Sequence, residues 1–234
     1  MENVKVCLFD LDGCLYDADN GYTAAIHGNI LSYMVEATYS KFSAITTLDE
    51  AQKVWRPIFD KYNLTKRGLI AEGYEIREKE YDEYIRRGEE IYIKRDDRLR
   101  EVLEGMKGVR KYIFSNGPEV SIHKCLKLLG IEDLMDGVFG TDFHLGTCKP
   151  ERACFDKVLA EIGMTGREGE VLYFEDSYKN LIRGKEMGMK TCFVNSTTLK
   201  EEGRGEDEIG VFDFVVRDIG RDWKEKVGGE GGEE

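Results

Sequence analysis

Several features that define other classes of protein are missing from this chain of 234 residues. No apolar run is long enough to cross a membrane, which takes about 20 predominantly apolar residues in a helix. The six cysteines form no CxxC pair and show no zinc-site spacing, so we predict no structural zinc site. No internal repeat is visible, which argues against a repeat architecture.

An excess of positive charge is also missing, because the formal net charge is −12 at pH 7. That sign argues against nucleic acid or an anionic membrane as the main partner. The N-terminal residues show no signal-peptide pattern, and Cys7 and Cys192 lie in apolar runs, as buried thiols do. We therefore expect a cytoplasmic protein, a monomer or a homodimer, whose partner is a small molecule.

What is present is the pattern of an α/β protein. Hydrophobic residues make up 41% of the chain and charged residues 34%, which fits a globular domain. Short apolar runs alternate with amphipathic helical segments, and these runs lie at 4–9, 112–114, 138–139, 171–174, 191–194 and 212–216. Continuous apolar strands alternating with helices predict a doubly wound, mainly parallel, Rossmann-like sheet covered on both faces.

One segment does not follow this pattern. Residues 17–95 are rich in tyrosine and charge and lack strong strand runs, and apolar residues recur in them at helical spacing. We predict a helical cap domain at 17–95, inserted into a core domain formed by 1–16 and 96–227. Residues 228–234 are Gly/Glu low complexity, for which we predict disorder.

The first strand ends in the stretch FDLDGCLY, residues 9–16. Asp10 and Asp12 follow the strand at the edge where ligands bind in open α/β sheets, and Gly13 allows a sharp turn behind them. Two carboxylates ~5 Å apart repel each other by roughly 3 kcal/mol at an effective dielectric of ~20, which a cation or a shared proton would relieve. The alternative is an ordinary turn with an N-cap, since Asp and Gly are common turn residues.

Polar residues follow three later strands or open the next helix. Ser115 and Asn116 are expected at a helix N-terminus, where main-chain N–H groups can bind an anion. Lys149 precedes another helix, where its charge has the unfavourable sign and calls for an anionic partner. Glu175 and Asp176 add two carboxylates at the edge that holds Asp10. Each feature also has an ordinary interpretation: a Ser/Asn cap, a solvated surface lysine and a doubly acidic cap.

Taken together, the four polar stretches resemble the four motifs of the haloacid dehalogenase-like superfamily, in the same order and across the whole core. The first motif in that superfamily is DxDx[T/V], and Cys14 stands where Thr or Val is usual. The resemblance implies that Asp10 is a nucleophile that forms an aspartyl-phosphate. It implies that Asp12 is the acid and base that protonates the leaving oxygen and then activates water.

The same resemblance implies a set of ligands. Mg²⁺ would be held by Asp10, by the main-chain carbonyl of Asp12 and by Asp176, with Glu175 beside these ligands rather than among them. The phosphoryl oxygens would be bound by three further residues, Ser115, Asn116 and Lys149. Haloacid dehalogenase chemistry is less well matched, because it does not need an acid at the Asp12 position.

A finer resemblance points to the substrate. The segments YNLTKRGL at 62–69, RDDRLR at 95–100 and CKP at 148–150 are similar to the pyrimidine 5′-nucleotidase branch. This implies a pyrimidine nucleoside 5′-monophosphate, whose base could stack on cap tyrosines and Tyr16 or meet Lys66 and Arg67. Alternatively, those tyrosines are core and those cations are solvated. Sugar-phosphate or phosphoglycolate phosphatases, phosphomutases and a non-enzymatic phosphate- or Mg²⁺-binding protein remain alternatives.

Overall fold

The structure is a computed structural model that describes residues 3–144, 146–194 and 205–228. The chain divides into two compact units, and the helical one is Gly21–Tyr92. The other unit, which contains the sheet, comprises the described residues up to Asn20 and from Ile93 onward. The insert predicted from the sequence, 17–95, is a few residues longer at each end. Of the tail predicted to be disordered, Gly228 ends a helix and 229–234 lie outside the described residues.

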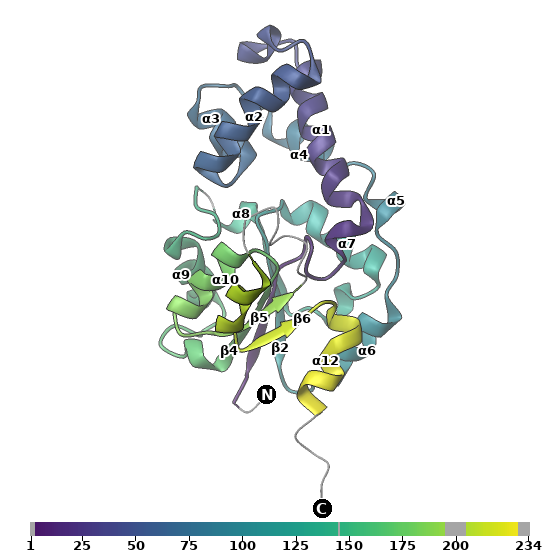
Figure 1. Ribbon diagram of the computed structural model, residues 1–234, viewed down its shortest axis with the longest axis vertical. Helices are drawn as coiled ribbons and strands as arrows, with labels where there is room; N and C mark the ends of the chain where they lie inside the picture. The colour runs from purple at the N-terminus through teal and green to yellow at the C-terminus, as the bar shows by residue number, and fades with distance from the viewer. Residues whose placement is uncertain (1–2, 145, 195–204, 229–234) are drawn as a thin grey trace, which may run out of the picture. The chain divides into compact units, whose positions relative to one another are not determined.

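The sheet unit is built on six parallel strands (Figure 1). They are β1 (Val6–Phe9), β2 (Arg110–Phe114), β3 (Gly137–Phe139), β4 (Val171–Glu175), β5 (Lys190–Val194) and β6 (Phe214–Val216). Their spatial order is β3-β2-β1-β4-β5-β6. Every residue of the central strands β1 and β4 is buried, which explains why these two strands read as unbroken apolar runs. The predicted doubly wound parallel sheet is confirmed.

Helices cover both faces of this sheet (Figure 1). They are α6 (Asp97–Gly105), α7 (Glu119–Leu129), α8 (Thr141–His144), α9 (Arg152–Glu161), α10 (Tyr178–Glu186) and α12 (Ile219–Gly228). Short 3-10 helices lie in the connections of this unit: η1 (Ala18–Asn20), η3 (Glu132–Leu134), η4 (Glu168–Glu170) and η5 (Glu206–Val211). On one face Tyr173 of β4 packs with Phe155 of α9, and on the other Phe174 meets Trp223 of α12, with ring centroids 4.9 Å apart. Adjacent strand residues point to opposite faces, so both faces are closed.

The strand order determines where a site can form. From β1 the chain proceeds outward through β2 and β3, then returns to place β4 on the other side of β1. The connections after β1 and β4 therefore run in opposite directions, and the crevice at the carboxyl ends of such strands is where doubly wound folds bind ligands. Asp10 lies at this point, with its main-chain N–H donating to the Phe174 carbonyl at 2.9 Å.

The helical unit contains α1 (Tyr22–Glu36), η2 (Ser40–Ala44), α2 (Leu48–Tyr62), α3 (Thr65–Ala71), α4 (Glu78–Ile85) and α5 (Glu89–Tyr92). Its core is aromatic: the Tyr33 ring meets Phe42 and Tyr81 edge-to-face, with centroids 5.8 and 4.9 Å apart. Such pairs contribute about 0.5–1.5 kcal/mol beyond the area they bury. Tyr33 and Tyr81 are therefore core residues. This agrees with the alternative given above, in which the tyrosines of the insert form its core.

Two features of the helical unit differ from the sequence pattern. Proline usually ends or kinks a helix, but Pro57 lies inside α2, which continues to Tyr62. The charged sequence of residues 76–93 has the character of one helix, but the segment forms α4 and α5 with a break between them, where Gly88 has a positive φ of 90°. Charge periodicity continued across the break, and only the glycine marked it.

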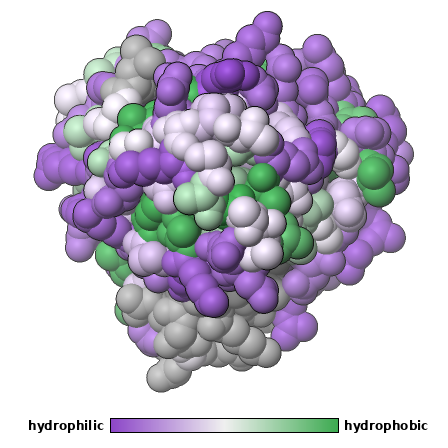
Figure 2. Space-filling view, turned by 90° about the horizontal axis from the view of Figure 1, so that it is seen from above, coloured by the Kyte–Doolittle hydropathy of each residue, from purple (hydrophilic) through white to green (hydrophobic). Residues whose placement is uncertain are grey.

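One face of the molecule is mostly polar. Figure 2 shows one face of the molecule, on which hydrophilic side chains predominate and hydrophobic ones gather only in small patches. Among the described residues, the helices are all too short or too polar to span a bilayer.

Candidate active site

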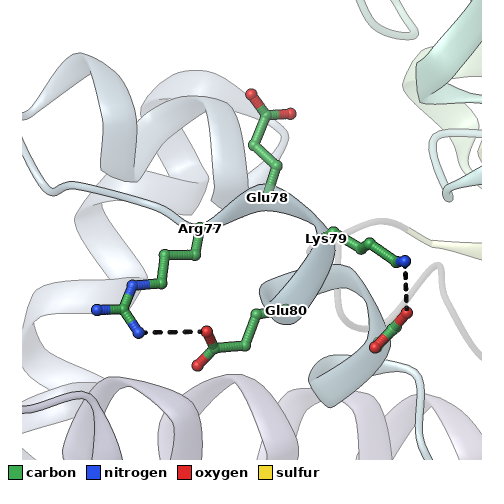
Figure 3. Close-up of a pocket in the computed structure, with 5 residues that line it drawn as sticks. Arg77, Glu78, Lys79 and Glu80 are labelled. Atoms are coloured by element: carbon green, nitrogen blue, oxygen red, sulfur yellow. Dashed lines mark hydrogen bonds and ion pairs between the residues drawn. The ribbon is translucent and has the colours of Figure 1, made fainter.

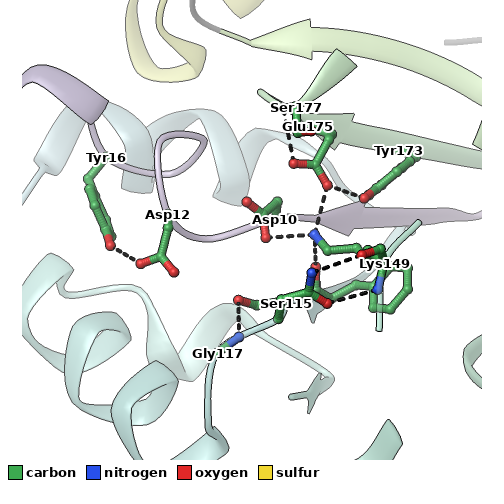
Figure 4. Close-up of polar contacts among 11 residues, drawn as sticks. Asp10, Asp12, Tyr16, Ser115, Gly117, Lys149, Tyr173, Glu175 and Ser177 are labelled. Carbon is green, nitrogen blue, oxygen red and sulfur yellow. Dashed lines mark hydrogen bonds and ion pairs between the residues drawn. The ribbon is translucent and has the colours of Figure 1, made fainter. Parts of the chain in front are cut away.

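A buried lysine forms the centre of the site. The side chain of Lys149 is 1% exposed, and its ammonium donates to Asp10 Oδ1 at 2.7 Å and to Glu175 Oε2 at 2.7 Å (Figure 4). It also donates to the Phe114 carbonyl, at 2.8 Å. These contacts join the ends of β1, β2 and β4 through one side chain. The alternative interpretation of Lys149 as a solvated surface residue is therefore wrong.

Burial and this lysine act against each other on the carboxylates. Burial raises the pKa of Asp10 to about 7, with a further upward push from the charge of Glu175 and a downward one from Lys149. Burial also acts to raise the pKa of Glu175, but the Lys149 ammonium and hydrogen bonds outweigh it, and that pKa is lowered. Both carboxylates raise the pKa of Lys149 despite its burial. The lysine is thus held as a cation between an ionised Glu175 and the Asp10 carboxyl.

Glu175 has further partners. The Tyr173 hydroxyl donates to Glu175 Oε2, and the Ser177 main-chain N–H donates to Oε1 at 3.2 Å. Burial raises the pKa of Tyr173 well above its usual value, so the phenol stays protonated and donates. The sequence analysis missed Tyr173, because a tyrosine inside an apolar strand reads as core. The available signal was its spacing: residues two apart on a strand share a face.

Three carboxylates form a compact acidic cluster. Oxygen atoms of Asp10, Glu175 and Asp176 lie within 4.8 Å of one another, and all three residues are buried. Burial raises the pKa of Asp176 well above its usual value, and the charges of Glu175 and Asp10 add to this. A Cβ on Gly13 would lie 2.5 Å from Asp176 Oδ2, so only glycine leaves room for this carboxylate. An all-oxygen anionic set of this kind fits a hard divalent cation such as Mg²⁺.

This cluster differs from the predicted ligand set in one respect. Glu175, expected beside the ligands, lies within the cluster, whereas the Asp12 side chain is not part of it. The prediction had assigned to Asp12 only its main-chain carbonyl. The Asp12 side chain instead accepts a hydrogen bond on Oδ1 from the Tyr16 hydroxyl (Figure 4). Tyr16 is buried.

The loop after β2 is arranged differently from the expectation. Helix α7 begins at Glu119 with Pro118 as its N-cap, so Ser115 and Asn116 precede the helix rather than form its first turn. Ser115 Oγ accepts from the Gly117 N–H at 3.0 Å. Asn116 donates from Nδ2 to the Lys149 carbonyl at 3.1 Å and accepts on Oδ1 from the Lys149 N–H at 2.9 Å. The Asn116 side chain thus holds the main chain of Lys149 in place.

The arrangement agrees with a comparison to known families. The model of the haloacid dehalogenase-like hydrolases matches residues 4–188. This chain belongs to the haloacid dehalogenase-like hydrolase family. The match begins just before β1 and ends after α10, so it includes all the acidic and basic residues described above.

Similar individual proteins include both phosphatases and dehalogenases. Phosphate metabolism protein 8 of Saccharomyces cerevisiae is 24% identical over 198 residues, which are 79% of this chain and 60% of that protein. The chain therefore spans less than two thirds of this relative's length. A HAD phosphatase from Thermococcus onnurineus is 21% identical, with 97% and 99% of the two chains covered and a TM-score of 0.65. L-2-haloacid dehalogenase from Xanthobacter autotrophicus is 20% identical, with 97% and 100% covered and a TM-score of 0.58. These two structures share the fold, and the fold alone does not distinguish their reactions.

The helical unit carries a pocket at the start of α4. It is lined by Arg77, Glu78, Lys79, Glu80 and Glu83 (Figure 3). Arg77 pairs with Glu80 at 3.5 Å and Lys79 with Glu83 at 4.0 Å, and all four side chains are exposed. Exposed ion pairs of this kind contribute about 0–1 kcal/mol. Since four of its five charged side chains already pair with one another in solvent, we assign no chemistry to this pocket.

Lys66, which the sequence analysis weighed as a contact for a nucleotide base, has protein partners. Its ammonium donates to Asp82 at 2.8 Å and lies 3.5 Å from Glu78. Both partners belong to the helical unit.

Proposed function

We propose that this hydrolase is a Mg²⁺-dependent phosphomonoesterase that acts through an aspartyl-phosphate on Asp10. The observation that supports this most is the buried contact of Asp10 with Lys149 at the carboxyl end of β1, together with a second carboxylate, Asp12, two residues farther along. A nucleophile needs a fixed position and a neighbouring positive charge that will also face the substrate phosphate. The Asp12 carboxyl suits a reaction whose leaving group must be protonated, which favours phosphate esters over haloacids.

The proposed reaction has two steps. A carboxylate oxygen of Asp10 attacks phosphorus, the bond from phosphorus to the ester oxygen breaks, and the departing oxygen takes a proton from Asp12. In the second step Asp12 takes a proton from a water molecule, which attacks the aspartyl-phosphate and releases inorganic phosphate. Lys149 would offset the negative charge on the phosphoryl oxygens. Ser115 is proposed to donate to these oxygens. Asn116, also predicted to contact them, forms two hydrogen bonds with the main chain of Lys149 and is proposed to position it.

Mg²⁺ is proposed to be held by Asp10 and Asp176 and by the main-chain carbonyl of Asp12, with Glu175 close enough to take part. When bound, it would neutralise part of the charge that gathers where carboxylates and a phosphate meet. The protein groups supply the rest: Lys149 balances Glu175, and Tyr173 keeps Glu175 directed at the lysine.

The proposed substrate is a small phosphate monoester, with a pyrimidine nucleoside 5′-monophosphate as the first choice. This choice is supported by the resemblance of residues 62–69, 95–100 and 148–150 to the pyrimidine 5′-nucleotidase branch. A cytoplasmic location is proposed because the six cysteines are buried thiols outside any disulfide, as suits a reducing compartment.

The chemistry is tested by Asp10→Asn, which is nearly isosteric but cannot serve as the nucleophile. We expect turnover of p-nitrophenyl phosphate to fall by at least about 10³-fold, as when other enzymes lose their nucleophile. Acid quenching with ³²P-labelled substrate should leave covalent label on the wild type and none on the variant. The matched control is Asp156→Asn, the same change on the exposed side of α9. Turnover of Asp10→Asn within tenfold of the wild type would disprove the covalent mechanism.

The substrate is tested separately by steady-state kinetics. Uridine and cytidine monophosphates are compared with purine nucleotides, phosphoglycolate, hexose phosphates and a chloroalkanoic acid. We expect the highest kcat/KM for a pyrimidine nucleotide. If a sugar phosphate or phosphoglycolate exceeds it by tenfold or more, the pyrimidine assignment fails and the phosphatase assignment stands. Isomerisation of a hexose phosphate without phosphate release would indicate a mutase, and halide release a dehalogenase.

A further inference from the structure

We propose that Tyr16 is a positioning residue for the acid–base carboxylate, Asp12, and that its hydroxyl is needed for the step in which the leaving group departs. This inference rests on the proposed function, because it takes Asp12 as the acid. The contact that supports it is the hydrogen bond from the Tyr16 hydroxyl to Asp12 Oδ1. An aspartate and a tyrosine four residues apart do not by themselves predict this hydrogen bond.

The local backbone brings the two side chains together. After Asp10 the chain closes a turn in which the Leu15 N–H donates to the Leu11 carbonyl at 3.1 Å and the Cys14 N–H to the same carbonyl at 3.3 Å. This turn brings Asp12 and Tyr16, four residues apart, close enough for their side chains to form the hydrogen bond. Gly13 makes the turn possible, because its φ of 80° is unfavourable for other residues.

The Tyr16 side chain is buried. Tyr16 is 8% exposed and its neighbour Leu15 is 3% exposed. A buried ring has few alternative rotamers, and its hydroxyl therefore fixes the rotation of the Asp12 carboxyl. Orientation matters for a group that must pass a proton to a departing oxygen, since a misplacement of about 1 Å can cost ~10²-fold in rate.

A second tyrosine–carboxylate pair at the same site provides a contrast. Tyr173 donates to Glu175, which faces Lys149 and exchanges no proton with substrate in the proposed reaction. Tyr173→Phe and Tyr16→Phe make the same chemical change, the loss of one buried hydroxyl that serves a carboxylate. They should differ in which part of the reaction they impair.

The experiment compares two leaving groups. p-Nitrophenolate departs without protonation, whereas the alkoxide of a nucleoside or alkyl phosphate must take a proton. Because kcat/KM reports the steps up to departure of the leaving group, we compare this quantity for both substrates in each variant. For Tyr16→Phe we expect a loss of ~10-fold or more on the alkyl ester and less than ~3-fold on p-nitrophenyl phosphate, because only the ester needs an oriented acid. Asp12→Asn should show the same asymmetry, with a larger loss.

Tyr173→Phe should lower kcat/KM by the same factor for both substrates. Tyr112→Phe removes a hydroxyl at the surface beside Arg110. It is the control for the loss of a tyrosine hydroxyl and should leave kcat/KM unchanged for both substrates. Thermal unfolding of each variant checks the fold, and Tyr16→Met tests the same loss of hydroxyl if the phenylalanine variant is unstable.

The possible failures can be told apart. An equal loss on both substrates for Tyr16→Phe would overturn the positioning role and leave Tyr16 as a packing residue. If Asp12→Asn shows no dependence on the leaving group either, then the assignment of Asp12 as the acid fails, and with it the proposed mechanism.

Discussion

Two lysine clusters, one in each unit, have nearly the same geometry and different consequences. Lys149 in the sheet unit lies 2.7 Å from Asp10 and from Glu175, and its side chain is 1% exposed. Lys66 in the helical unit lies 2.8 Å from Asp82, and both of those side chains are 15% exposed. A distance alone therefore does not tell what an ion pair contributes. The surroundings decide, because removing charges from water costs several kcal/mol per ion.

The comparison indicates what each cluster is for. Replacing a buried ion pair by apolar residues is often neutral or stabilising, so the Lys149 cluster is poorly explained by stability. Its position at the carboxyl ends of β1 and β4 points instead to binding and catalysis. The Lys66 pair is partly hydrated, and the helical unit is held mainly by its aromatic core around Tyr33 and Phe42. Four variants, ordered by the size of the expected effect, test this difference.

Lys149→Met is expected to have the largest effect. It removes the cation from two buried carboxyl groups and should lower the free energy of unfolding by about 3–5 kcal/mol, as breaking one side of a buried pair does. Activity should be lost as well. Urea denaturation at fixed pH measures the stability.

The cause is checked in a double variant. Adding Glu175→Gln to Lys149→Met removes the charge that the lysine had balanced, so part of the stability should return while activity stays absent. If the double variant is no more stable than Lys149→Met, then packing around the lysine stem, and not an uncompensated charge, accounts for the loss.

Asp176→Ala is expected to have the second-largest effect, and that effect is on metal binding. It removes one oxygen ligand of the acidic cluster, and the Mg²⁺ concentration needed for half-maximal activity should rise at least ~10-fold. Calorimetric titration with Mg²⁺ gives a readout that does not depend on turnover. Asp156→Ala, the same truncation at the surface of α9, is the control. An unchanged Mg²⁺ requirement would show that Asp176 is no ligand and only precedes α10.

Much of this arrangement could be predicted from the sequence, for a physical reason. Parallel strands buried on both faces read as apolar runs, and their carboxyl ends share one edge, so Asp10 and Glu175 could be placed near each other without a structure. The family motifs then brought Lys149 to the same edge. Periodicity also separated the helical segment from the rest of the chain.

The specific partners could not be predicted. The Lys149–Asp10 contact joins residues 139 positions apart, and the bond from Asn116 to Lys149 joins residues 33 apart. Such contacts depend on how loops of different strands meet, and the spacing of residues in one sequence carries no signal for this. Tyr173 was missed because burial of a tyrosine in a strand is usually a matter of packing.

Asn116→Ala is expected to have a moderate effect. It removes two hydrogen bonds to the main chain of Lys149, each with a net contribution of about 0.5–1.5 kcal/mol. Stability should therefore fall by roughly 1–3 kcal/mol, and kcat should fall because the lysine is less well placed. Asn116→Asp keeps the acceptor for the Lys149 N–H and loses the donor. Its stability should therefore lie between that of the wild type and that of Asn116→Ala. If phosphate binding weakens while stability is unchanged, Asn116 is a phosphate ligand, as the sequence had suggested.

Lys66→Met should have the smallest effect, and it completes the comparison with Lys149→Met because the substitution is the same. The Lys66 ammonium sits beside Asp82, which keeps partial access to water, so the carboxylate can be hydrated when the lysine is gone. We expect the free energy of unfolding to change by less than ~1 kcal/mol. The long stem of methionine replaces the packing of the lysine stem, so any difference reports mainly the charge. A loss as large as that of Lys149→Met would mean that 15% exposure already excludes enough water to make the pair behave as buried.

The same variant tests the role in base recognition weighed for Lys66: a rise in KM for a pyrimidine nucleotide, with no rise for p-nitrophenyl phosphate, would show that Lys66 leaves Asp82 to meet the substrate.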